Sequence, residues 1–270
     1  MSKLCGIILL LAVWACGQPE SDRRGPARGP RTFVFVHGGW GGGWGFKQVD
    51  SLLTRAGHVV YRPTLTGLGE RVHLSSASLG LDTHIDDVVN VILYEDLSDL
   101  ILVGHSYGGM VVSGVAHRIP GRIAHLVLVD AFLPEHGESV MSMTGNSITE
   151  LGKHSPPWRA KDGYLVPLWV ETSQEPPKAV PHPIKTLTQP IHLDNPAASL
   201  IPGTFILTKE PGAQADAFSA SAERARARGW AYYELEGDHN PQLSQPGTLV
   251  ALLLRVPEAP PRIIDPVPSR

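Results

Sequence analysis

LILVGHSYGG, residues 100–109, sets a Gly-x-Ser-x-Gly motif directly after a run of apolar residues. The apolar run predicts a buried strand and the residues from Tyr107 onward predict a helix, so Ser106 stands in a tight turn between them. Side chains at Gly104 and Gly108 would collide with neighbouring backbone in such a turn, which accounts for both glycines. The turn presents the serine hydroxyl at a helix N-terminus, where backbone N–H groups stabilise an anion. The motif therefore predicts Ser106 as a nucleophile.

A serine nucleophile needs a general base because its hydroxyl hardly ionises near neutral pH. The chain has 12 histidines. Among them, His239 follows the last predicted strand, residues 231–235, and Gly237 precedes it, which is where the base is expected when the chain order is nucleophile, acid, base. We therefore predict His239 as the general base. The other histidines show no metal-ligand spacing, so the sequence gives no case for a metal site or a cofactor.

The carboxylate that would orient the imidazole has two main candidates. Asp130 ends the apolar strand 124–129, where an unpartnered carboxylate would be costly to bury, and it would sit at the carboxyl edge of the sheet beside the nucleophile. Glu210 follows the next predicted strand, residues 204–208, which is the more usual place for the acid. We favour Asp130 and keep Glu210 open; the remote options are Asp216 and Asp238.

Two backbone N–H groups are needed to stabilise the charge that develops on the oxygen of a tetrahedral intermediate. The N–H of Tyr107, directly after the nucleophile, is one expected donor. The other is expected from the glycine-rich loop after the first apolar strand, with Gly39 as the favoured residue. We expect His37 and His105, which border the site, to have structural hydrogen-bonding roles. Candidates for an apolar pocket wall are Trp40, Trp44, Tyr107, Trp158 and Trp169.

Outside these motifs, short apolar runs alternate with helical patterns. This alternation favours an α/β fold with a mostly parallel, twisted sheet and helices on both faces. Thr83 and Asp86 resemble a capping box that would open a helix through Tyr94. Residues 133–200 are rich in proline and break the alternation, so we predict a small cap inserted over the carboxyl edge of the sheet. The expected strands are residues 32–36, 58–62, 100–104, 123–130, 204–208 and 231–235, and the expected helices are residues 46–56, 83–94, 107–118, a segment ending near 229, and 248–256.

The two ends of the chain differ in composition from its body. Residues 1–16 read as an export signal and end in a pattern similar to a bacterial lipoprotein cleavage site, in which Cys16 would be lipidated. We expect export to the periplasm or the extracellular space, with a membrane tether through Cys16; a plain signal peptide is the alternative. Residues 17–30 predict a solvated tether, 31–256 one folded domain, and 257–270 a proline-rich tail.

Charge and cysteine usage exclude several classes of function. The formal net charge of -3 gives no electrostatic footprint for nucleic acid, so we expect no nucleic-acid partner. The two cysteines, Cys5 and Cys16, both lie in the expected signal segment. The folded body therefore holds no internal disulfide, no cysteine-ligated metal and no cysteine nucleophile.

With these residues assembled, the chain resembles the α/β-hydrolase superfamily over residues 31–256. It is most similar to the branch that contains plant methyl-ester esterases, hydroxynitrile lyases and bacterial pyrethroid- or aryl-ester hydrolases. The resemblance implies a cofactor-independent fold with a cap, which acts on carboxylic esters through an acyl-enzyme. Because the candidate pocket residues are aromatic, we expect the esters to be small to medium hydrophobic substrates. The segments that carry it are residues 36–39 with Trp44, 102–110, 130–134 and 237–239.

Three departures from relatives in this superfamily bear on the expected chemistry. The plant esterases carry their acid shortly after the strand equivalent to 204–208, where this chain reads Lys209-Glu210-Pro211. Hydroxynitrile lyases of the branch carry a lysine directly after the catalytic histidine, where Asn240 stands here, which weakens a lyase reading. Dehalogenases and most epoxide hydrolases of this fold use an aspartate nucleophile, and Ser106 argues against both. A lyase or carbon–carbon bond hydrolase on the same triad stays open as an alternative, as does a ligand-binding protein without catalysis.

Overall fold

The computed structural model describes residues 29–145, 158–212 and 218–257. Several predictions concern residues outside these ranges. They are the export signal, the lipidation of Cys16, most of the tether and of the C-terminal tail, and Asp216 as a remote candidate for the acid.

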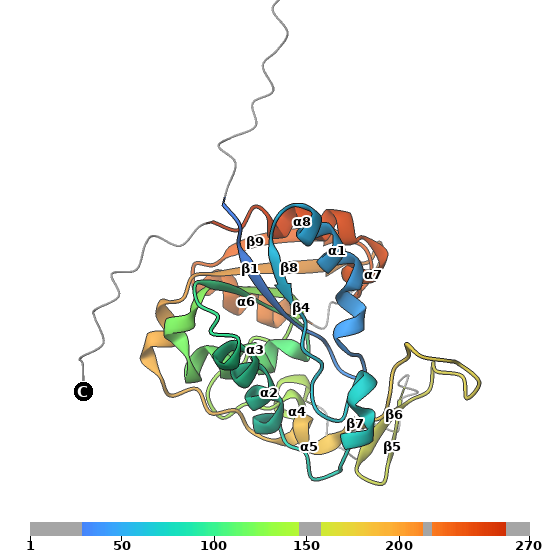
Figure 1. The fold of residues 1–270 in the computed structure, drawn as a ribbon. Helices are drawn as coiled ribbons and strands as arrows, with labels where there is room; N and C mark the ends of the chain where they lie inside the picture. The colour runs from blue at the N-terminus through green and yellow to red at the C-terminus, as the bar shows by residue number, and fades with distance from the viewer. Residues whose placement is uncertain (1–28, 146–157, 213–217, 258–270) are drawn as a thin grey trace, which may run out of the picture.

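A parallel six-stranded sheet forms the centre of the molecule, as the alternating pattern predicts (Figure 1). Its strand order is β2-β1-β3-β4-β8-β9, and neighbouring strands run parallel at every pairing. Every residue of β4 is buried, which explains why this strand reads as an almost continuous apolar run. The strands are β1 (Thr32–Val36), β2 (Val59–Tyr61), β3 (Leu100–Ser106), β4 (Ile123–Ala131), β8 (Gly203–Lys209) and β9 (Ala231–Glu236).

Helices cover both faces of the sheet because side chains alternate along each central strand. In β1, Phe33 and Phe35 pack into the core under α1 (Lys47–Arg55) and α8 (Pro246–Leu253), whereas Val34 faces the opposite core. That opposite core is covered by α2 (Leu81–Tyr94), α3 (Gly108–Arg118) and α6 (Ser219–Ala227). Figure 1 shows the two sets of helices above and below the strands.

The start of α2 differs from its prediction. The helix begins at Leu81 with Gly80 as its N-cap, and no side chain caps it. Thr83 therefore lies inside the first turn, and the predicted capping box with Asp86 is wrong. Asp86 instead forms an ion pair with Arg118 at the end of α3. Leu81 is buried, so the helix extends far enough to bring this apolar side chain into the core.

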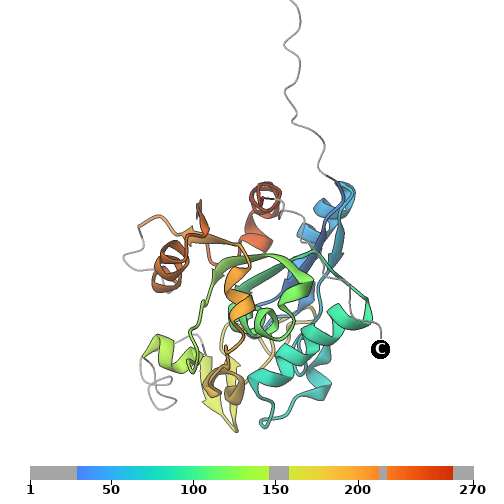
Figure 2. The same cartoon turned by 90° about the vertical axis from the view of Figure 1, so that its left-hand side faces the viewer.

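The proline-rich insertion contains more regular structure than the sequence pattern indicates. A three-stranded antiparallel sheet is built from β5 (Trp158–Lys161), β6 (Tyr164–Pro167) and β7 (His182–Pro183). Both views place β5 and β6, in yellow, at the end of the molecule away from α8, in red (Figures 1 and 2). The other elements between 133 and 200 are α4 (Val140–Thr144), α5 (Ile184–Thr188) and a 3₁₀ helix, η4 (Pro196–Leu200).

Within the described residues, four short elements outside the insertion complete the connections. They are the 3₁₀ helices η1 (Gly43–Phe46), η2 (Gly69–Leu74) and η3 (Pro120–Arg122), and α7 (Pro241–Ser244), which the sequence pattern did not predict. In the described ranges, no helix has both the length and the apolar character needed to cross a membrane.

Candidate active site

Ser106 is the last residue of β3, and its backbone has the left-handed conformation, with a φ of 55°. A Cβ built on Gly108 would lie 2.5 Å from the carbonyl oxygen of Val36, and one on Gly104 would lie 2.9 Å from that of Gly108. Both glycines are therefore required by close backbone approach, as predicted from the motif. The strained turn points the serine side chain out of the end of the strand, toward the loop after β9.

His239, from the loop after β9, lies between Ser106 and Asp130. Its Nε2 atom is 3.0 Å from the Ser106 hydroxyl and its Nδ1 atom is 2.5 Å from Oδ2 of Asp130. Because a carboxylate only accepts, Nδ1 donates to Asp130, and Nε2 then accepts the serine proton in the neutral imidazole. The side chain of Asp130 is 4% exposed and that of His239 is 39% exposed. The geometry is that of a nucleophile, a base and an orienting carboxylate.

Asp130 reaches the histidine because the pairing of β3 with β4 is irregular at this point. His105 pairs with Val129 and Ser106 pairs with Ala131, so Asp130 is an extra, bulged residue, and its φ is 45°. A bulge turns a side chain out of the regular alternation of the strand. The other oxygen of the carboxylate, Oδ1, accepts the backbone N–H of Thr208 in β8 at 3.1 Å.

Glu210, the alternative acid, follows β8 and is exposed. The strand β8, which precedes Glu210, thus contributes the backbone N–H of Thr208 to Asp130. The structure brings Asp130, and not Glu210, to the imidazole of His239. Asp238, the other remote option, accepts the N–H of Asn240 at 2.8 Å within its own turn.

Two aromatic side chains hold the His239 ring in place. The ring of Phe218 stacks on it at a centroid distance of 5.1 Å and an angle of 6°, and the ring of His105 lies 4.7 Å away. His105 also donates from Nε2 to the carbonyl oxygen of His239 at 2.7 Å. The structural role expected for His105 is therefore observed. Nothing in the sequence singles out Phe218, which is the N-cap residue of α6 and lies far from the motifs.

The glycine-rich loop after β1 lies directly against the nucleophile. A Cβ built on Gly38 would be 3.0 Å from Cβ of Ser106. His37 accepts the N–H of Leu65 at Nε2 (3.1 Å), so its Nδ1 carries the proton and donates it to the carbonyl oxygen of Gly38 at 2.8 Å. The C=O and N–H of a trans peptide point in opposite directions. The bond to Gly38 therefore turns the N–H of Gly39 away from the His37 ring; that this N–H binds the oxyanion stays a prediction.

Tyr107, whose N–H is the second expected donor, has its side chain in the core and not in the site. It is 3% exposed, and its hydroxyl donates to Nδ1 of His84 at 2.9 Å, because Nε2 of His84 donates to the carbonyl oxygen of Thr66. Burial raises the pKa of the Tyr107 hydroxyl. The phenol therefore stays protonated and anchors the turn that follows Ser106.

Three tryptophans gather where the cap meets the loop after β1. Trp40 stacks on Trp158 at 5.1 Å and meets the edge of Trp169 at 5.5 Å, and its indole N–H donates to the carbonyl oxygen of Leu165. Half of the Trp169 side chain is exposed. These side chains form an apolar wall next to Gly39, and the prediction that Trp40 lines a substrate pocket stays a prediction.

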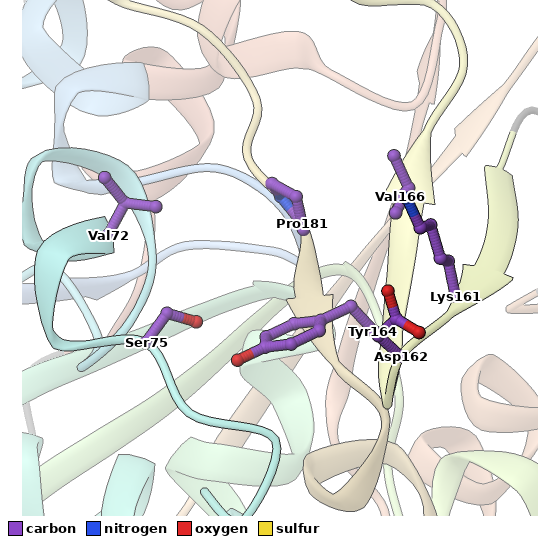
Figure 3. Close-up of a pocket in the computed structure, with 7 residues that line it drawn as sticks. All are labelled: Val72, Ser75, Lys161, Asp162, Tyr164, Val166 and Pro181. Carbon is purple, nitrogen blue, oxygen red and sulfur yellow. The ribbon is translucent and has the colours of Figure 1, made fainter.

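Two cavities open beside the cap, and neither is lined by Trp40, Trp158 or Trp169. One, of about 300 Å³, lies between η2 and the three-stranded sheet; in it Tyr164 extends from β6 toward Ser75, and Lys161, Asp162 and Val166 line the other side (Figure 3). The other, of about 620 Å³, is lined by Trp44, Arg62 and Glu70 among others. None of the residues of the Ser106, His239 and Asp130 group lines either cavity. In the parts of the chain that are described, no cluster of His, Cys, Asp and Glu could hold a metal ion.

Buried histidines make the folding stability depend on pH. Burial lowers the pKa of His37 to about 4, that of His105 to about 3 and that of His125, in β4, to about 4. The unfolded chain binds these protons near pH 6.5. At a pH between the folded-state and the unfolded-state pKa values, the unfolded chain binds more protons than the folded protein. The free energy of unfolding therefore falls on acidification from pH 6.5 toward pH 4.

We therefore expect urea denaturation at pH 7, 6 and 5 to give progressively smaller free energies of unfolding. Each group contributes a slope of up to about 1.4 kcal/mol per pH unit. His125→Gln, which changes a site remote from Ser106, removes the contribution of one histidine to this slope and serves as the matched control. A stability that is flat or rises on acidification, or an equal slope in the variant, contradicts this assignment.

Two relatives from the comparison of sequences carry esterase names. The chain is 54% identical over 112 residues to the carbendazim hydrolyzing esterase of Nocardioides sp. (strain SG-4G), which covers 42% of this chain and 46% of that protein. It is 24% identical over 265 residues to putative methylesterase 15, chloroplastic, of Arabidopsis thaliana, which covers 86% of this chain and 58% of that protein. The chain thus matches about half the length of these relatives.

Solved structures and a family comparison agree on the fold. An extracellular alpha/beta-hydrolase from a Paenibacillus species superimposes with a TM-score of 0.65 at 24% identity, covering 83% of this chain and 98% of that one. The pattern of the alpha/beta hydrolase family matches residues 33–252, which is most of the described structure. The predicted fold class is confirmed, and the chain belongs to the alpha/beta hydrolase family.

Proposed function

We propose that this protein is a serine-dependent hydrolase of carboxylic esters, acting through an acyl-enzyme on small to medium hydrophobic substrates. The observation that carries the proposal is the hydrogen-bonded chain from Ser106 through His239 to Asp130, beside a glycine-rich loop whose Gly38 lies against Ser106. The esterase names of the two relatives support the same reaction class. The tryptophan wall next to Gly39 favours an apolar substrate.

In the first half-reaction, the Ser106 oxygen forms a bond to the ester carbonyl carbon while its proton passes to Nε2 of His239. The carbonyl oxygen becomes an oxyanion, which the N–H groups of Gly39 and Tyr107 stabilise. When the tetrahedral intermediate collapses, the bond from carbon to the alkoxy oxygen breaks and the leaving alcohol takes the proton from His239. The acyl group remains on Ser106.

Water reverses these steps in the second half-reaction. His239 takes a proton from the water, whose oxygen adds to the acyl carbon, and then returns the proton to Ser106 as the carboxylic acid leaves. The imidazole is cationic in the middle of each half-reaction. Asp130 stabilises that cation and fixes the tautomer, and the Phe218 ring stacked on the imidazole keeps its orientation.

The proposal is tested with a series of p-nitrophenyl esters of increasing chain length. We expect Ser106→Ala to lower kcat by at least about 10³-fold, because the nucleophile is lost. Asp130→Asn should lower it by about 10⁴-fold, because the amide favours the wrong tautomer of His239. Glu210→Gln, the matched carboxylate control, should leave kcat unchanged.

Two outcomes would overturn the assignments. If the wild type cleaves no ester in the series and a fluorophosphonate leaves Ser106 unlabelled, the hydrolase proposal fails. If Glu210→Gln loses activity while Asp130→Asn keeps it, the acid is Glu210. Turnover of cyanohydrins or vinylogous diketones in the absence of ester hydrolysis would instead identify a lyase or a carbon–carbon bond hydrolase on the same residues.

We also propose that the protein is exported and tethered to a membrane through a lipid on Cys16. The support is the apolar run in residues 1–16, which ends at a pattern similar to a lipoprotein cleavage site, and the polar segment 17–30, which would space the folded domain of residues 31–256 from the membrane.

Fractionation of a bacterial host that expresses the full chain tests this second proposal. We expect the wild type in the membrane fraction with a lipid-modified Cys16 at its N-terminus. Cys16→Ser, which cannot be lipidated, should be released from that fraction. Wild type and variant distributed alike, with Cys16 unmodified, would contradict the tether, and a cytoplasmic protein with its N-terminus intact would contradict export.

A further inference from the structure

His182 is a fully buried cap residue that contacts the loop beside the nucleophile. It belongs to β7 and is 0% exposed. Its Nδ1 atom accepts the backbone N–H of Trp40 at 3.2 Å, and a Cβ built on Gly39 would lie 3.5 Å from the same atom. The imidazole therefore packs on the backbone of the residue whose N–H is the proposed oxyanion donor.

The hydrogen bonds around His182 define one tautomer. Because Nδ1 accepts, the proton of the neutral ring is on Nε2, which donates to the hydroxyl of Thr186 at 2.6 Å. Thr186 in turn donates to the carbonyl oxygen of Pro183 at 2.8 Å. The other titratable groups around the ring are His37, His84 and Tyr107, and burial lowers the pKa of His182. The neutral ring thus accepts from Trp40 at Nδ1, while its Nε2 donates to Thr186.

The conformation of Trp40 depends on this contact. Its φ is 60°, a left-handed backbone in a residue with a bulky side chain. Such a conformation persists only where surrounding contacts hold it. The cap supplies two of these contacts: His182 binds the N–H of Trp40, and the N–H of Val180 donates to its carbonyl oxygen at 2.9 Å.

His182 also contacts the second donor. The ring of Tyr107 meets it edge-on at a centroid distance of 4.9 Å, and the hydroxyl of Tyr107 is held by His84. One cap side chain therefore touches both segments that present the N–H groups of Gly39 and Tyr107.

We propose that His182 is a positioning residue that holds the Gly39 N–H in place for the oxyanion, so that docking of the cap completes the oxyanion hole. This inference rests on the proposed ester hydrolysis. An oxyanion donor acts mainly in the transition state, and a shift of about 1 Å costs up to about 10²-fold in rate. Loss of the His182 contact should therefore lower kcat and leave KM nearly unchanged.

Three substitutions separate the contact to Trp40 from simple packing. His182→Leu removes both hydrogen bonds. His182→Asn retains an acceptor near the position of Nδ1, and His182→Gln places its amide near the position of Nε2, where it reaches Thr186 and not Trp40. His192→Leu is the matched control, because His192 is an exposed cap histidine.

We expect His182→Leu and His182→Gln to lower kcat for p-nitrophenyl esters by about 10- to 100-fold, and His182→Asn to recover most of it. The inhibition constant of a trifluoromethyl ketone, whose adduct with Ser106 places an oxyanion in the hole, should rise in parallel with the loss of kcat. His192→Leu should behave as the wild type. If His182→Leu does not fold, the difference in kcat between His182→Asn and His182→Gln tests the inference.

Equal kcat and inhibition constants in the wild type, the Asn variant and the Gln variant would overturn the inference, as would a rise in KM alone, which would make His182 a substrate-binding residue. If the wild type cleaves esters and these variants are unaffected, only the role of His182 fails. A wild type that neither cleaves esters nor binds the ketone overturns the proposed function together with this inference.

Discussion

Two adjacent parallel strands, β3 and β4, each carry a residue with a left-handed backbone at their carboxyl end, and the arrangement of the site depends on this constraint. Ser106 has a φ of 55° and Asp130 a φ of 45°. In a regular pair of strands, neighbouring side chains alternate between the two faces and point into the helices that cover them. The turn at Ser106 and the bulge at Asp130 instead direct a hydroxyl and a carboxylate beyond the edge of the sheet, where one imidazole from the loop after β9 reaches both.

Strain of this kind needs support from tight surroundings, and the structure provides it from several directions. The glycines on either side of Ser106 allow the backbone of β1 and α3 to approach within contact distance. The N–H of Thr208 holds the free oxygen of Asp130. His105 holds the carbonyl of His239, and His37 holds the carbonyl of Gly38. Both of these histidines are buried and kept neutral by burial, so each can offer one donor and one acceptor in a fixed direction.

Much of the sheet and the identity of Ser106 and His239 as site candidates could be predicted, because both follow from local patterns. The apolar runs match the buried strands, and a Gly-x-Ser-x-Gly motif requires a strand before it and a helix after it. The acid stayed open because the strands before Asp130 and Glu210 end at the same edge of the sheet. The bulge at Asp130 decides which of the two carboxylates reaches His239, and a bulge leaves no periodic signal in the sequence.

Other features depend on the tertiary structure to different degrees. The turn at Asp162-Gly163, with φ values of 52° and 84°, joins β5 to β6. An Asp-Gly pair that follows an alternating segment, here Trp158–Lys161, and precedes an apolar one is a known hairpin signal that could have predicted this element. The contacts of His182 to Trp40 and of Phe218 to His239 join distant segments, and no spacing in the sequence indicates them. The prediction of a capping box at Thr83 was wrong because the helix begins two residues earlier, at Leu81, whose side chain is buried in the core.

The most direct test of the account is a search for the covalent intermediate on Ser106. The protein would be mixed with a p-nitrophenyl ester, quenched in acid during turnover, and examined by mass spectrometry of the intact chain and of its peptides. The account predicts a transient mass increase equal to one acyl group, located on the peptide that contains Ser106. Ester turnover that proceeds with no acyl adduct on that peptide would contradict it.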